Sequence, residues 1–175
     1  MVYVLISTHN NKNEVIGILK CLVIQSYKSI KIVLVDDGST DNTEQEVKKL
    51  FPNVAVLRGN GRLWWTGANV MGVDFIIEEA REGDFILLLN NDLVVEEDYV
   101  EKLLNASISN GRAIVGSTLV DYDNPDFMES GKQRKRKKFK QKVDYIPQFY
   151  PGSEKVSARR RKIMDPSKRC LLYTS

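Results

Sequence analysis

Two adjacent acids, Asp36 and Asp37, follow an apolar run and stand directly before the sequence Gly-Ser-Thr-Asp. Neighbouring carboxylates repel each other and lose hydration when buried, so such a pair at the end of a strand has an energetic cost. A carboxylate in that position can accept a hydrogen bond from the N3–H group of a pyrimidine base. We therefore interpret the pair as part of a nucleotide site. A turn that leads into a capped helix is the alternative.

A third acid, Asp92, ends the sequence Asn90-Asn91-Asp92 after another apolar run. Oxygen ligands suit hard divalent cations such as Mg²⁺ and Mn²⁺, and such an ion stabilises the charge that grows on a diphosphate leaving group. Because Asp92 is the only acid of the three, we expect a weak metal site that fills when a nucleoside diphosphate is bound. The alternative interpretation is a polar turn before a helix.

A glycine-rich stretch, 59–62, precedes two adjacent tryptophans, Trp64 and Trp65. Glycines let backbone N–H groups approach an anion, and Arg62 can pair with a phosphate. A plain turn explains the same stretch equally well. Because neighbouring side chains of an extended chain point in opposite directions, we expect one tryptophan in the core and the other in a sugar pocket.

Short apolar runs alternate with helical patterns over the first 120 residues. This alternation predicts βαβ units and a mainly parallel sheet, and the continuous apolar strands indicate that helices cover both of its faces. The predicted elements are strand 2–7, helix 14–26, strand 30–35, helix 43–51, strand 53–59, helix 65–83, strand 85–89, helix 96–111 and strand 113–120.

Polar clusters follow four of the predicted strands. Ligands of parallel α/β sheets bind outside the carboxyl ends of the strands, so the four clusters predict one site. The clusters are Ser7-Thr8-His9-Asn10, Asp36-Asp37-Gly38-Ser39, Gly59-Asn60-Gly61-Arg62 and Asn90-Asn91-Asp92.

Four motifs occur in the order VLISTHNN, VLVDDGSTDNT, GNGRLWWTGANVMG and LLLNNDLVV. With this order and spacing the chain resembles family 2 glycosyltransferases from about Val2 to Leu119. The resemblance implies a Rossmann-like GT-A fold, incomplete at the C-terminus, and transfer of a sugar from a UDP- or dTDP-type donor to a glycan or lipid-linked acceptor with inversion. The tryptophan-containing motif is similar to a bacterial branch that builds surface polysaccharides, often with rhamnosyl donors.

The resemblance also implies roles for single residues. It implies that the pyrimidine base of the donor contacts Asp37, and that Ser7 and His9 lie beside this base. It leaves Asp36 to hold backbone or the ribose, and it gives Asn69 a role in fixing the loop or touching the donor. The implied nucleotide-sugar-binding set is Ser7, Thr8, His9, Asp36, Asp37, Gly61, Arg62, Trp65, Asn69 and Asn91, with Asp92 as the ligand of Mg²⁺ or Mn²⁺.

The charge of the chain changes sign near residue 131. Residues 1–131 carry 11 Lys/Arg and 20 Asp/Glu, a net charge of −9, whereas residues 132–175 carry 15 and 3, a net charge of +12. We therefore expect a nucleotide-sugar-binding half at 1–131, a basic loop with one further strand at 132–150, and a disordered or poorly packed tail at 151–175.

The resemblance weakens near residue 148. An inverting transferase needs a general base, and after Pro147 the acids are only Glu154 and Asp165, in sequence unlike the family. The catalytic residues therefore stay unassigned. We interpret the chain as a fragment or as a reading that leaves the family frame there, and a nucleotide-binding fragment without activity is the alternative function.

Other classes of protein fit the sequence less well. A dinucleotide-dependent oxidoreductase needs a glycine-rich loop directly after the first strand, and a receiver domain needs its acid pair there. The basic run 132–142 contains one aromatic residue, Phe139, so it lacks a stacking platform for nucleic acid, and we interpret it as a solvated loop. An anionic membrane surface is the other partner considered for this run.

The sequence also bears on the compartment. The apolar run 2–6 is too short for a signal peptide, and none of the other apolar runs could span a bilayer. The two cysteines, Cys21 and Cys170, have no metal-type spacing and suit a reducing compartment. We expect a cytoplasmic protein, with the inner face of the membrane as a peripheral location.

Overall fold

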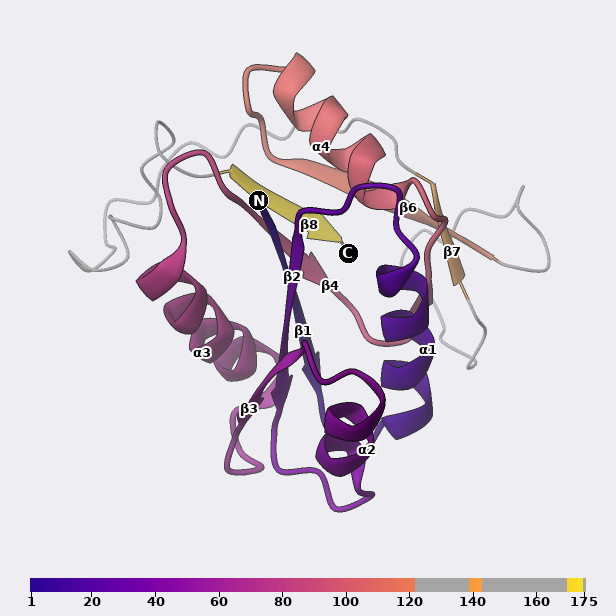
Figure 1. Ribbon diagram of the computed structural model, residues 1–175, viewed down its shortest axis with the longest axis vertical. Coiled ribbons are helices and arrows are strands. Elements are labelled where there is room, and N and C mark those ends of the chain that lie inside the picture. The colour runs from indigo at the N-terminus through magenta and orange to yellow at the C-terminus, as the bar shows by residue number, and fades with distance from the viewer. Residues whose placement is uncertain (122–138, 143–169, 175) are drawn as a thin grey trace.

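The computed structural model describes residues 1–121, 139–142 and 170–174, which form a mainly parallel sheet with helices on both faces (Figure 1). The strands are β1 (Val2–Thr8), β2 (Ile30–Asp36), β3 (Ala55–Arg58), β4 (Phe85–Leu89), β5 (Leu93–Val94), β6 (Val115–Asp121), β7 (Phe139–Lys142) and β8 (Cys170–Thr174). The helices are α1 (Lys12–Val23), α2 (Thr43–Leu50), α3 (Trp64–Glu79) and α4 (Tyr99–Ser109).

The strands follow the order β3-β2-β1-β4-β8-β6-β7-β5. β7 runs antiparallel to β6 and pairs in parallel with β5, and the other neighbouring strands pair in parallel. The carboxyl ends of β1 and β2 lie in the lower part of Figure 1, where loops lead into α1 and α2. The alternation of strands and helices in the first 121 residues thus has the βαβ arrangement that the sequence predicts.

Two hydrophobic cores lie on the two faces of the sheet. Val4 and Ile6 of β1 pack in the core that α1, α2 and α4 cover, whereas Tyr3 and Leu5 pack in the core under α3. Successive side chains of a strand point to opposite faces, so a continuous apolar run is what a strand covered on both sides requires.

One glycine brings α3 close to the sheet. A Cβ atom on Gly72 would collide with the side chain of Leu5 on β1, so a larger residue would have to displace that side chain or the helix. The sequence predicts a weak point in the helix at this glycine, because glycine lowers helix stability. The structure shows what offsets that cost, namely closer packing of α3 against β1.

The C-terminal part differs from the prediction where it is described. The sequence predicts a disordered or poorly packed tail at 151–175, whereas Cys170–Thr174 form β8 between β4 and β6. A short apolar run shows no periodicity of its own, and its pairing partners lie more than fifty residues away. β7 likewise lies within the predicted basic loop, and the predicted strand at 143–147 falls outside the described residues.

Candidate functional site

The carboxyl ends of the central strands meet along one edge of the sheet. Thr8 on β1 pairs with Asp36 on β2, and Asp36 pairs with Arg58 on β3. From the loop after β4, the Asn91 amide donates a hydrogen bond to the Thr8 hydroxyl at 3.0 Å. The structure therefore brings together Thr8, Asp36 and Asn91 of the predicted set.

Asp36 is fully buried, at 0% exposure. Its Oδ1 accepts a hydrogen bond from the Ser39 backbone N–H at 2.8 Å, and its backbone carbonyl accepts from the N–H groups of Gly38 and Gly59, both at 2.8 Å. Its Oδ2 has no hydrogen-bond partner among the described residues. One oxygen thus shapes the turn after β2, while the other could accept a hydrogen bond from a further donor.

Asp37 binds the backbone of the loop after β3. Its Oδ1 accepts from the Gly61 N–H at 2.8 Å, and its Oδ2 accepts from the N–H groups of Leu63 and Trp64 at 2.9 and 3.0 Å. The residue is 5% exposed. These donors lie at the N-terminus of α3, where unpaired N–H groups and the helix dipole favour a negative charge.

Two glycines allow this close approach. A Cβ atom on Gly59 would lie 2.5 Å from Asp37 Oδ1, and one on Gly38 would lie 2.8 Å from the Gly61 nitrogen. The glycine-rich stretch is predicted to let N–H groups approach an anion, and in this structure the anion that Gly61 approaches is the carboxylate of Asp37.

Both tryptophans are exposed, Trp64 at 81% and Trp65 at 49%. The prediction that one of them lies in the core is therefore wrong. Its premise was an extended chain, but α3 begins at Trp64, so the two side chains do not alternate between opposite faces. Asn69, which the sequence predicts to fix the loop or touch the donor, is buried. Its side-chain amide donates to the Trp65 carbonyl at 2.9 Å and so holds the first turn of α3.

The loop after β1 is tied to the loop after β2. Asn10 N–H donates to Ser39 Oγ at 2.9 Å, and Asn10 Oδ1 accepts from the Thr40 N–H at 2.7 Å. Because that oxygen faces Thr40, the Asn10 Nδ2 group donates to His9 Nε2 at 2.9 Å. His9 then carries its proton on Nδ1 and donates it to the carbonyl of Asp37 at 2.6 Å.

Asp41 caps two helices at once, in keeping with the alternative of a turn that leads into a capped helix. Its Oδ2 accepts from the Lys12 N–H of α1 at 3.0 Å, and its Oδ1 accepts from both the N–H and the hydroxyl of Thr43 in α2. Partial burial acts to raise the pKa of Asp41, but these hydrogen bonds outweigh it and hold the pKa below its usual value. The signal available in the sequence was an Asp two residues before a predicted helix start.

Three further predicted residues lie at the same edge and are more exposed than Asp36 and Asp37. Ser7 is partly buried on β1, and Arg62 and Asp92 are exposed in the loops after β3 and β4. Within the described part of the chain, no group of three or more His, Cys, Asp or Glu side chains could hold a metal ion. A single exposed carboxylate fits a Mg²⁺ or Mn²⁺ ion that takes its other ligands from a diphosphate and water.

A pocket of about 370 Å³ lies at the other end of β2. Ile30 and Ile32 line it together with Leu22 of α1 and Phe51 after α2. Because it sits at the start of β2 and Asp36 sits at the end of that strand, this pocket is separate from the candidate site.

Solved structures of the S. aureus protein TarS resemble this fold. Its residues 1–349 superpose with a TM-score of 0.52 at 22% identity, covering 68% of this chain and 34% of that one. Its complex with UDP-GlcNAc gives a TM-score of 0.50 at 22% identity, covering 68% of this chain and 33% of that one. The likeness shows an α/β fold of the GT-A class.

The chain belongs to glycosyl transferase family 2, which it matches over residues 3–166. An uncharacterized glycosyltransferase of Haemophilus influenzae is 31% identical over 133 residues, which are 74% of this chain and 49% of that protein. Glycosyltransferase GlyG of Streptococcus pneumoniae is 25% identical over 129 residues, 72% of this chain and 41% of that protein. The chain thus spans about half or less of the length of these relatives.

The family match continues beyond residue 148, the point where the sequence alone suggests a departure from the family. Among the described residues, none of the helices has the length and apolar character needed to cross a bilayer.

Proposed function

We propose that this chain belongs to an enzyme that transfers a sugar, with inversion, from a nucleoside diphosphate sugar to a glycan or lipid-linked acceptor. The observation that supports this most is the polar carboxyl edge of the sheet, where the loops after β1, β2 and β3 are joined by hydrogen bonds around Asp36 and Asp37. Parallel α/β sheets bind ligands at this edge. TarS has been solved with UDP and with UDP-GlcNAc, which supports a UDP-type donor, with dTDP as the other pyrimidine candidate.

The proposed base contact is Asp37, with Ser7, Thr8 and His9 beside it. Oδ1 of Asp37 accepts one hydrogen bond, from Gly61, and a carboxylate oxygen has capacity for two. The N3–H group of uracil or thymine would take the second position. Asp36 is fully buried and its Oδ1 accepts from the Ser39 backbone, so of its two expected roles, holding backbone or the ribose, we propose the first.

The proposed diphosphate site combines Arg62, Asn91 and Asp92. Arg62 is exposed at the edge and can pair with phosphate oxygens. Asp92 would hold Mg²⁺ or Mn²⁺, which stabilises negative charge on the departing diphosphate when it is bound. The protein's part is to hold the donor in place and to exclude purine nucleotides through the base contact.

A nucleotide-binding chain without transferase activity is the second candidate. It is favoured because the acceptor side has no assigned general base, and such a base typically contributes about 10²–10⁴-fold to the rate.

For the transferase, we further propose a cytoplasmic location at the inner face of the membrane and a rhamnosyl-type donor.

Calorimetric titration with UDP, dTDP, ADP and GDP tests the donor class. We expect the two pyrimidine nucleotides to bind about 10–100-fold more tightly, the range for a hydrogen bond to a charged group. Equal affinity for purines and pyrimidines would contradict the proposed base contact. Release of UDP or dTDP from UDP-GlcNAc, UDP-glucose and dTDP-rhamnose separates the two candidates, because only a transferase should cleave a donor.

A further inference from the structure

The structure points to a second role for Asp37, which acts through the loop Gly59–Trp64. We propose that Asp37 is a positioning residue: its carboxylate caps α3 from the end of the neighbouring strand and so fixes this loop at the donor edge before any nucleotide binds. The catalytic consequence rests on the proposed function. The structural consequence does not, because it follows from the hydrogen bonds between the Asp37 carboxylate and the loop.

The cap is needed because α3 supplies none of its own. Its N-cap residue is Leu63, which has no side-chain hydrogen bond to offer, and its first turn contains no acid. Without Asp37 the N–H groups of Leu63 and Trp64 would lose their acceptor. Unpaired backbone donors at a helix start are costly, and a nearly buried carboxylate is a strong acceptor for them.

Trp64 shows what the cap holds in place. Its φ is +55°, in the left-handed region that bulky residues rarely adopt. Such a conformation persists only where the surroundings determine it, and here the Trp64 N–H is bound to Asp37 Oδ2 at 3.0 Å. Asp37 thereby sets where the exposed indole of Trp64 stands at the carboxyl edge.

A second contact joins the loop after β1 to Asp37 at the end of β2. His9 donates to the carbonyl of Asp37, while the carboxylate of the same residue binds the loop after β3. The ends of β1 and β2 and the start of α3 therefore share Asp37 as their common partner. A change at this residue should loosen the loop, and a site populated only part of the time binds its ligand more weakly by that fraction.

Fluorescence of the ligand-free chain tests the proposal directly. Trp64 and Trp65 are the only two tryptophans, so time-resolved tryptophan anisotropy reports on the end of this loop and the first turn of α3. In Asp37→Asn, the amide NH₂ cannot accept a hydrogen bond, so at least one N–H of the loop loses its acceptor. We expect a larger fast-decaying component than in the wild-type chain, and a dissociation constant for UDP that rises about tenfold.

Asp84→Asn is the matched control. Asp84 also accepts hydrogen bonds through both oxygens, from the Met1 ammonium and the Arg81 N–H, but it lies at the opposite end of the sheet. We expect the control to change thermal stability and to leave the tryptophan anisotropy at the wild-type value. A fall in anisotropy in both variants would show general loosening of the fold and would overturn the proposal.

Gly59→Ala provides an independent test that keeps the carboxylate. Its Cβ would meet Asp37 Oδ1 at 2.5 Å and Leu63 Cδ1 at 2.7 Å, so it disturbs the contact between the carboxylate and the loop from the loop side. Gly17→Ala introduces a Cβ with no atom within 4 Å. We expect the fast component in Gly59→Ala and not in Gly17→Ala. If circular dichroism shows that Asp37→Asn does not fold, the anisotropy of Gly59→Ala decides whether the proposal stands.

Wild-type anisotropy in folded Asp37→Asn or Gly59→Ala would overturn the proposal without touching the proposed function. If UDP binding is nevertheless weaker in that Asp37→Asn variant, Asp37 belongs to the base contact alone. Conversely, loss of loop order in a chain that cleaves no donor would support the positioning role and count against the transferase proposal.

Discussion

At the scale of single residues, the acids of this chain differ in the hydrogen bonds that their carboxylate oxygens accept. Asp37 and Asp41 already accept hydrogen bonds from backbone N–H groups through both oxygens. Asp92 is exposed, and among the described residues it belongs to no group of three or more His, Cys, Asp or Glu side chains that could hold a metal ion. A carboxylate without backbone partners can take a cation together with diphosphate oxygens and water, so Asp92 stays our proposed metal ligand.

Asp92→Asn should uncouple metal from nucleotide. In the wild-type chain we expect Mn²⁺ to tighten UDP binding on the order of tenfold, because the ion would bridge Asp92 and the diphosphate. The variant should bind UDP with the same affinity with and without Mn²⁺ in calorimetric titrations. Asp74→Asn, which changes an exposed acid on α3, is the control and should keep the metal effect. A wild-type affinity that does not respond to a chelator would count against Asp92 as a ligand.

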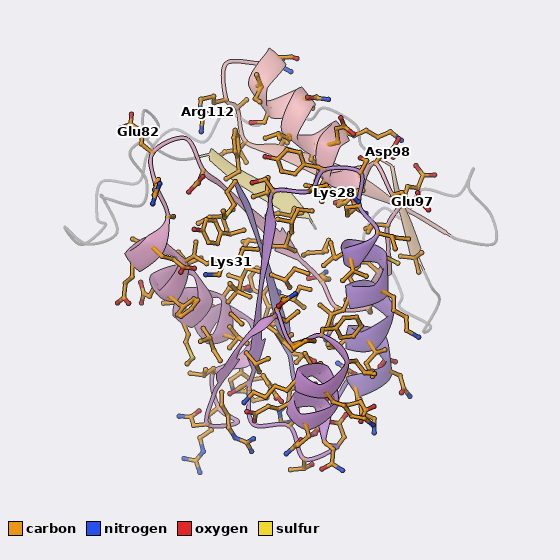
Figure 2. All side chains as sticks on the ribbon, in the orientation of Figure 1. Lys28, Lys31, Glu82, Glu97, Asp98 and Arg112 are labelled. Carbon is orange, nitrogen blue, oxygen red and sulfur yellow. The ribbon has the colours of Figure 1, made fainter. Side chains whose placement is uncertain are left out.

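At the scale of elements, one buried amide joins α1 to α4. Gln25 is 1% exposed; its Nε2 donates to the carbonyls of Cys21 and Glu96 at 3.1 and 2.7 Å, and its Oε1 accepts from the Val100 N–H at 3.0 Å. Figure 2 shows Lys28 and Asp98 near this upper end of α1. Gln25 thereby caps α4 from the segment after α1, as Asp37 caps α3 from the end of β2.

Gln25→Ala should destabilise the fold by about 3 kcal/mol. The substitution leaves buried backbone groups without partners and opens a cavity, and both effects lower the free energy of unfolding. Urea unfolding followed by circular dichroism measures the change. Gln45→Ala, on the exposed face of α2, should stay within about 0.5 kcal/mol of the wild-type value. A similar loss in both variants would show that the buried hydrogen bonds of Gln25 contribute little.

At the scale of the whole molecule, stability should decline on both sides of a plateau. Hydrogen bonds hold the pKa of Asp41 and of Asp84 below the usual value despite partial burial, and hydrogen bonds from Lys48 and Arg58 do so for Glu44. The stabilisation from such acids is present above their unfolded pKa and is lost as the pH falls through the lower folded value. Burial raises the pKa of Tyr99, so its contribution is lost as the pH rises above about 10.

Urea midpoints measured between pH 3 and pH 11 should therefore form a plateau with two declining limbs. Asp84→Asn should make the acid limb shallower, because the variant has one fewer acid to protonate. Tyr99→Phe should flatten the alkaline limb and lower the plateau, since it also removes the 2.8 Å hydrogen bond with Ser117. Limbs that are unchanged in both variants would assign the pH dependence to other groups.

Much of the fold follows from the sequence because its cause is local. Apolar runs such as Val2–Thr8 and Phe85–Leu89 are strands covered on both faces, and the buried positions of α1 recur with the helical period. The grouping of polar clusters at one edge follows as well, because parallel strands that alternate with helices must all end on the same side.

Tertiary structure decided which polar atoms of the site have hydrogen-bond partners within the protein. The three donors to Asp37 lie 24 to 27 residues further along the chain, so no local pattern could show that its carboxylate caps α3. The placement of β8 inside the sheet depends equally on distant partners. Sequence patterns determine which elements form, because those depend on neighbouring residues, whereas the partner of each polar atom depends on how the elements pack together.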